Sequence, residues 1–90
     1  MKKYVIEREI AGIGKLGPAE VKGAAATSNA ALAKLGGRVQ WLQSFVAQDK
    51  TFCIYLAETE GDVREHAKLS GFPANRITEV GAVIDPTTGA

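Results

Sequence analysis

The sequence predicts an α+β fold, in which a four-stranded antiparallel sheet carries two helices on one face. Four segments alternate apolar and polar residues with period two, as strands do. Two other segments repeat apolar residues every three or four positions between recognisable helix caps. The length of 90 residues suits one small domain, so we expect a single domain over residues 1–90, without a repeat or a linker.

The first strand is expected over residues 3–10. Tyr4, Ile6 and Arg8 share one of its faces, because side chains alternate across a strand. A loop punctuated by three glycines follows at residues 11–17. The segment before this loop has the period of a strand, and the segment after it has the period of a helix. We therefore expect the loop to connect a strand to a helix.

The first helix is expected over residues 18–35. Pro18 suits the first helical position, and the pair Gly36-Gly37 after the last turn is a strong stop signal. Many alanines in the centre of this segment allow close packing against the sheet. The apolar stripe expected to face the sheet consists of Val21, Ala25, Ser28, Leu32 and Leu35.

The remaining elements are a hairpin, a short helix and a last strand. Two alternating runs, over residues 38–48 and 51–57, are separated by a short polar turn and predict a hairpin. The second helix is expected over residues 60–70, with Thr59 as its N-cap. The last strand is expected over residues 76–84, and a polar tail ends the chain.

The resulting order, β-α-β-β-α-β, is the ferredoxin-like pattern. The right-handed crossover rule leads us to expect the first and third strands as parallel neighbours. Both helices are then expected to cover one face of the sheet. This topology leaves the opposite face without a covering element of the same chain.

The alternation also predicts which side chains lie on that open face. We expect Phe52, Ile54 and Leu56 to meet the helices together with Tyr4 and Ile6. In the second strand, Val39, Trp41, Gln43 and Phe45 are expected to share one face. The open face is expected to carry Val5, Glu7, Glu9, Cys53 and Tyr55. Such a face is too apolar for water alone, so we expect a homodimer of the dimeric α/β-barrel type.

Composition excludes several classes of function. A formal charge of +1 provides no basic surface for nucleic acid. No apolar run approaches the roughly 20 residues of a membrane helix. One cysteine cannot form an internal disulfide, and the basic start shows no signal-peptide pattern, so we expect a cytoplasmic protein.

Three residues could support metal or acid–base chemistry: His66, Cys53 and Glu7. Imidazole and thiolate together suit nickel or zinc, although no motif such as CxxC or HxxxH supports a site. The alternatives are a hydrogen-bonded histidine beside the core, a buried thiol that acts as a small hydrophobe, and a paired strand acid. Because Cys53 is expected on the face opposite the helices, His66 is expected at a rim or between subunits.

Several segments resemble a small bacterial family of ferredoxin-like domains whose members carry the label nickel-binding-protein-like. These segments are KYVIERE (residues 3–9), FCIYLA (52–57), REHA (64–67), GFPANR (71–76) and VIDPT (83–87). The resemblance implies a dimer of the α/β-barrel kind and nickel binding. Glu7, Cys53, Tyr55 and His66 match the family's pattern, which implies metal contacts for three of them and a ligand contact for Tyr55.

Two functions follow as hypotheses. The first is a small dimeric protein that binds a divalent metal such as nickel through His66 with Cys53 or Glu7. The second is a cofactor-free enzyme or small-molecule-binding protein of the dimeric barrel type, with Glu7 or His66 as proton carrier. A purely structural interaction module is a third reading, and the residues by themselves define no catalytic set.

Overall fold

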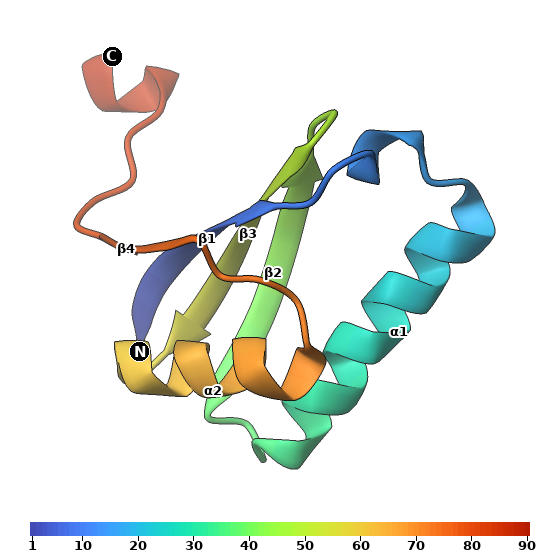
Figure 1. Cartoon of the computed structure of the whole chain (residues 1–90). Coiled ribbons are helices and arrows are strands. Elements are labelled where there is room, and N and C mark those ends of the chain that lie inside the picture. The colour runs from blue at the N-terminus through green and yellow to red at the C-terminus, as the bar shows by residue number, and fades with distance from the viewer.

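A computed structural model describes residues 1–90 and shows the expected order of elements. Figure 1 shows both helices on the same side of the sheet. The elements are β1 (Lys2–Glu9), η1 (Ile13–Lys15, a 3-10 helix), α1 (Pro18–Lys34), β2 (Val39–Val46), β3 (Lys50–Ala57), α2 (Glu60–Ser70), β4 (Arg76–Val80) and η2 (Pro86–Gly89, a second 3-10 helix). The ferredoxin-like α+β prediction is confirmed.

The strand order is β2-β3-β1-β4, and every neighbouring pair is antiparallel. The prediction that the first and third strands are parallel was wrong. The crossover rule applies to the unit β1-α1-β2, whose two strands run in the same direction but are separated by β3. β3 therefore occupies the place between them with the opposite direction.

The assignment of faces along β3 was also wrong. Tyr4 pairs with Tyr55 and Ile6 pairs with Cys53, and residues paired directly across a sheet share a face. All four side chains are buried on the side of the helices. The open face instead carries Val5, Glu7, Phe45, Phe52, Ile54, Leu56 and Val80. The side chains on both faces of β3 are mostly apolar. Alternation therefore separates the two sets of side chains without deciding which set meets the helices.

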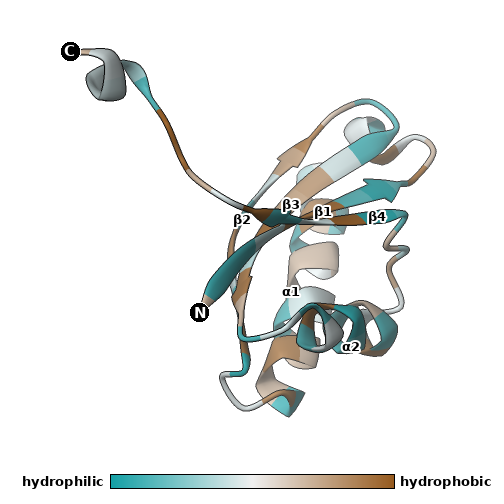
Figure 2. Cartoon of the chain, turned by 90° about the vertical axis from the view of Figure 1, so that its left-hand side faces the viewer, coloured by the Kyte–Doolittle hydropathy of each residue, from teal (hydrophilic) through white to brown (hydrophobic).

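Two further differences concern β2 and β4. A bulge between Trp41 and Gln43 shifts the register of β2, so strict alternation stops there and Trp41 and Ser44 both face the helices. β4 ends at Val80, earlier than the alternation predicts. Beyond it the chain leaves the sheet, and Figures 1 and 2 show it extending away from the domain.

The two helices cover the sheet unequally. α2 buries four residues, including His66, whereas α1 buries only Ser28 and Ala31 along its length. Val21 in the first turns of α1 is 47% exposed. The first half of α1 therefore covers the sheet loosely. Neither helix combines the length and the apolar character that a membrane span requires.

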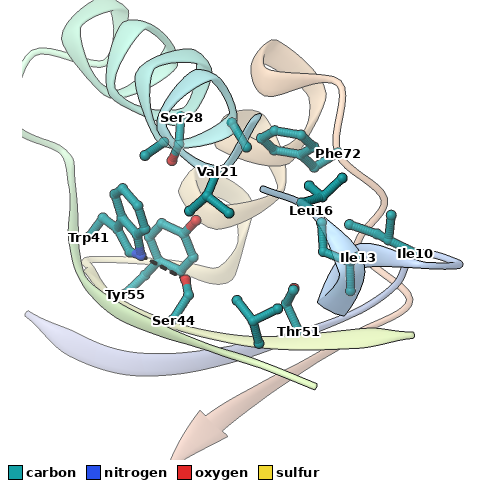
Figure 3. Close-up of a pocket in the computed structure, with 13 residues that line it drawn as sticks. Ile10, Ile13, Leu16, Val21, Ser28, Trp41, Ser44, Thr51, Tyr55 and Phe72 are labelled. Carbon is teal, nitrogen blue, oxygen red and sulfur yellow. Dashed lines mark hydrogen bonds between the residues drawn. The ribbon is translucent and has the colours of Figure 1, made fainter. Parts of the chain in front are cut away.

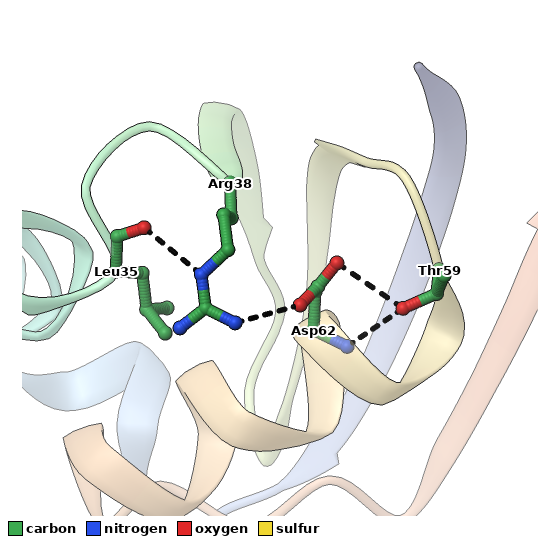
Figure 4. A network of polar contacts seen from close by, with 4 residues as sticks. All are labelled: Leu35, Arg38, Thr59 and Asp62. Atoms are coloured by element: carbon green, nitrogen blue, oxygen red, sulfur yellow. Dashed lines mark hydrogen bonds and ion pairs between the residues drawn. The ribbon is translucent and has the colours of Figure 1, made fainter.

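A polar network ties the start of α2 to the loop after α1, as Figure 4 shows. Thr59 Oγ1 accepts a hydrogen bond from the Asp62 backbone N–H at 3.2 Å, which confirms the N-cap prediction. Asp62 also pairs with Arg38 at 3.1 Å, and Arg38 Nε donates to the Leu35 carbonyl at 3.2 Å. The N-terminus of α2 is thus fastened to the α1–β2 connection.

Replacing Thr59 with alanine is expected to lower the free energy of unfolding by about 1 kcal/mol, the usual effect of losing an N-cap side chain. Chemical denaturation followed by circular dichroism measures the change. Thr27→Ala is the matched control, because Thr27 is exposed within α1 and bonds only to the carbonyl of Gly23. Equal losses in the two variants would contradict a capping role for Thr59.

Candidate functional site

A cavity of about 120 Å³ lies between α1, η1 and the sheet, and ten of its thirteen lining residues are hydrophobic (Figure 3). The first half of α1 lines the cavity on the side opposite the sheet, and the segment around η1 lines one of its ends. Its walls include Ile10, Ile13, Leu16, Val21, Trp41, Val46 and Phe72. Val21 and Val46 are both about half exposed, at 47% and 54%, so the cavity reaches the surface where they lie.

Tyr55 supplies a buried hydroxyl at the inner end of this cavity. Its side chain is only 2% exposed, and Figure 3 shows its hydroxyl oxygen pointing toward the helix that carries Val21 and Ser28. The Arg8 guanidinium donates a hydrogen bond to that oxygen at 3.3 Å. Tyr55, which the family resemblance marked for a ligand contact, thus lines a cavity on the side of the helices.

Arg8 is a buried cation, with 2% of its surface exposed. Besides Tyr55 it bonds to the carbonyl oxygens of Phe72 and Pro73, at 3.3 and 2.8 Å. Its guanidinium carbon lies 5.8 Å from the centre of the Phe72 ring. None of the ion pairs in the chain includes Arg8. Its charge is therefore held by neutral groups alone.

His66 is fully buried behind Tyr55, and the expectation of a rim or inter-subunit position does not hold. The two rings are 4.8 Å apart between centroids, and His66 Nε2 lies 3.3 Å from Ser28 Oγ. α1 covers this part of α2, which removes the imidazole from solvent. Nδ1 is buried without a hydrogen-bond partner.

Burial sets the protonation of both rings. It raises the pKa of Tyr55 above its ordinary value of 10.0, although the nearby Arg8 charge acts in the opposite direction. Burial also lowers the pKa of His66 from its ordinary value of 6.5, and Arg8 lowers it further. Tyr55 is therefore a neutral hydrogen-bond donor, and His66 is a neutral imidazole.

Glu7 and Cys53 are the other two predicted metal ligands. Glu7 lies away from His66 and Tyr55, and Cys53 is enclosed in the core. Glu7 is on the open face, where its carboxylate is 3.6 Å from Lys50 Nζ. Cys53 shares the helix side with His66, but it is buried and its sulfur is 3.5 Å from the Thr51 hydroxyl. The fold thus places Cys53 and His66 on one side of the sheet and Glu7 on the other.

Comparison with known proteins identifies the family of this chain. The family described as "Nickel responsive protein SCO4226-like" matches residues 4–80. The chain belongs to this family. A crystal structure of SCO4226 from Streptomyces coelicolor A3(2) aligns with 91% of this chain and 99% of that chain, at a TM-score of 0.75 and 15% identity. At that identity the structural match shows the shared fold. No curated protein matches the chain.

The name of the SCO4226-like family raises the question whether this chain has a nickel site. No group of three or more His, Cys, Asp or Glu side chains converges to hold a metal ion. His66 and Cys53 are enclosed in the core, and Glu7 lies across the sheet from them. The donors of one chain therefore do not fit a nickel site.

Sequence reasoning overlooked Arg8 as a member of this candidate site. The available signal was its place on the same strand face as Tyr4 and Ile6, because an arginine in an apolar stripe must be buried with partners or break the pattern. Ser28 carried a similar signal, as the polar member of the α1 stripe. Which polar groups they meet depends on strand register and helix packing.

Acidification is expected to destabilise the protein through His66. Its pKa is lower in the folded state than in the unfolded chain, so below about pH 6.5 the unfolded chain binds the proton first and stability falls as pH falls. The groups facing the ring from other elements are Arg8, Tyr55 and Ser28. The free energy of unfolding should therefore be lower at pH 5.5 than at pH 7.5.

Urea denaturation at several pH values, with His66→Gln as the comparison, measures this slope. The variant lacks the titrating ring and should lose much less stability over the same range. Parallel curves for the two proteins would assign the pH dependence to other groups.

Proposed function

We propose that this protein binds a small, ring-sized apolar ligand in the cavity between α1, η1 and the sheet. The observation that carries the proposal is an apolar chamber into which the buried hydroxyl of Tyr55 is directed. Its volume of about 120 Å³ is close to the roughly 150 Å³ of an engineered apolar cavity that binds benzene. Apolar walls with a few placed polar groups are the usual composition of ligand sites.

The proposal is binding without a catalytic step. Neither Glu7 nor His66, the two groups considered as proton carriers, is among the residues that line the cavity. His66 contacts the site through Tyr55 and Ser28, and Glu7 belongs to the open face. The cavity therefore supports the small-molecule-binding hypothesis in its non-enzymatic form.

Trp41 makes the proposal directly testable, because it is the only tryptophan of the chain and lines the cavity. Titration with toluene is expected to change its fluorescence in a saturable way. Ala25→Leu should abolish the change by filling the cavity. Ala26→Leu is the matched control, since this neighbouring alanine is exposed on the same helix. An absence of saturation in the unmodified protein would refute the proposal.

We also propose that the open face of the sheet pairs with a second copy of the chain. The two helices lie on the opposite side, and Phe45 on the open face is 56% exposed. Phe52, Ile54 and Leu56 continue this apolar surface along the central strand β3. A face of this composition is typical of an association surface.

Analytical ultracentrifugation of the unmodified protein and of variants on the open face tests whether the protein is a dimer. The unmodified chain is expected to sediment as a dimer and Ile54→Asp as a folded monomer, because the substitution places an unpaired charge in the interface. Leu69→Asp is the control, since Leu69 is partly exposed on α2, away from the open face. A monomer at all concentrations of the unmodified protein would remove the proposal.

Nickel binding is the second candidate function, and the name of the family is the observation that favours it. Isothermal titration of the metal-free protein with nickel chloride tests it. Saturable heat that disappears in His66→Ala, or in Glu7→Gln, would support the respective residue as a ligand. Heat that both variants retain would place the ligands elsewhere, and no heat in the unmodified protein would exclude this function for the chain.

A further inference from the structure

We infer that the ligand of this cavity carries a carboxylate on its ring-sized apolar body, and that the Tyr55 hydroxyl receives this carboxylate in the field of the buried Arg8 cation. The inference rests on the proposed function, since it names the chemical class of the molecule that occupies the same site. It follows from three features of the inner end of the cavity: an uncompensated charge, a hydroxyl hydrogen that is not donated, and a second hydroxyl beside it.

The first feature is the charge of Arg8. A buried cation is costly unless it is paired, and buried charged groups in proteins usually meet a countercharge. Arg8 is 2% exposed, yet its hydrogen-bond partners are two backbone carbonyls and the Tyr55 oxygen. No carboxylate of the chain is paired with it. An anion bound at the adjoining end of the cavity would supply the missing countercharge.

The second feature is the direction of the hydrogen bond between Arg8 and Tyr55. Guanidinium groups only donate, so the Tyr55 oxygen is the acceptor in that contact, and it also accepts from the neighbouring Ser28 hydroxyl, since both contacts lower the pKa of Tyr55. The hydroxyl hydrogen is then free to be donated. Because the oxygen points into the cavity (Figure 3), that hydrogen is available to a ligand oxygen. Burial raises the pKa of Tyr55, which keeps the hydrogen in place.

The third feature is Ser28, which lines the same end of the cavity and is 3.3 Å from His66 Nε2. His66 Nδ1 has no partner. An unpartnered buried N–H is rarer and more costly than an unpartnered acceptor, so the favoured tautomer carries its hydrogen on Nε2. Ser28 then accepts from His66, and its own hydroxyl hydrogen is directed at the Tyr55 oxygen. The Tyr55 hydroxyl hydrogen is thereby left to donate to a carboxylate, in the field of one buried cation.

The experiment compares three ring-sized probes by Trp41 fluorescence: toluene, benzamide and benzoate. Benzamide has the shape of benzoate without its charge. The unmodified protein is expected to bind benzoate at least about 10-fold more tightly than benzamide, since hydrogen bonds to charged groups contribute more than neutral ones. Tyr55→Phe should erase this preference while toluene binding is retained.

Tyr4→Phe is the matched control, because Tyr4 is equally buried on the same sheet face and does not line the cavity. Its preference for benzoate should be unchanged. Arg8→Gln should lose the preference as Tyr55→Phe does, and retained toluene binding would show that the cavity is intact. If toluene binds but benzoate and benzamide bind equally, the inference is overturned and the proposed function stands. If no probe binds, the proposed function itself fails.

Discussion

Replacing Ile6 with alanine is expected to lower the free energy of unfolding by about 2–5 kcal/mol, the range for truncating a large buried aliphatic side chain. Ile6 has no exposed surface and lies in the middle of β1, paired with Cys53 on one side and Ile77 on the other. Truncation would leave a cavity between the sheet and its helices that rigid strands cannot close. Urea denaturation at low micromolar protein concentration measures the loss.

Ile54→Ala is the informative comparison for this variant. Ile54 lies opposite Val5 on the open face and is only partly buried within one chain. Its truncation should cost less at low protein concentration, and the loss should grow where the proposed dimer forms. An Ile54 variant that is as destabilised as the Ile6 variant at every concentration would contradict the assignment of the two faces.

Gly14→Ala is expected to lower the free energy of unfolding by about 1–3 kcal/mol, as overpacking usually does. A Cβ atom at this position would lie 2.5 Å from the Ala47 carbonyl oxygen, a backbone atom that cannot rotate away. The Gly14 N–H also donates to the Gln48 carbonyl at 2.9 Å. The substitution should therefore detach η1 from the β2–β3 hairpin, and with it one wall of the cavity.

Thermal unfolding combined with toluene titration measures both consequences, because the variant should unfold earlier and bind the probe more weakly. Gly23→Ala provides the control. A Cβ atom at Gly23 meets no neighbouring atom, and alanine is the better helix former, so this variant should gain about 0.5–1 kcal/mol. A Gly14 variant with unchanged stability would mean that the hairpin and η1 are not in close contact.

The elements of the fold could be predicted because their signals are local. Thr59 and Gly71 mark the ends of α2 by hydrogen bonding and by a positive φ of 79°, whatever the rest of the chain does. Pro18 and the glycines after α1 act in the same way. The end of β4 at Val80 was missed, because the alternation continues beyond the point where β1 offers a partner.

The candidate site could be predicted only in part. Tyr55, Cys53 and His66 were named from their chemistry and from the family resemblance, yet strand alternation placed Cys53 and Tyr55 on the wrong face. Both sets of β3 side chains are apolar, so hydrophobicity alone could not choose between them. Arg8 was seen on the correct face but was not recognised as the charge behind Tyr55.

The sequence by itself determined the number, kind and order of the elements, and hence the ferredoxin-like topology, because caps, turns and periodicity act over a few residues. Tertiary structure decided which face of β3 meets the helices, where β2 bulges, and which residues of α1 are buried. These depend on register and packing between segments that are distant in the chain, as in the Arg8–Tyr55 contact across 47 positions. The cavity exists because such distant segments meet there without filling the space between them.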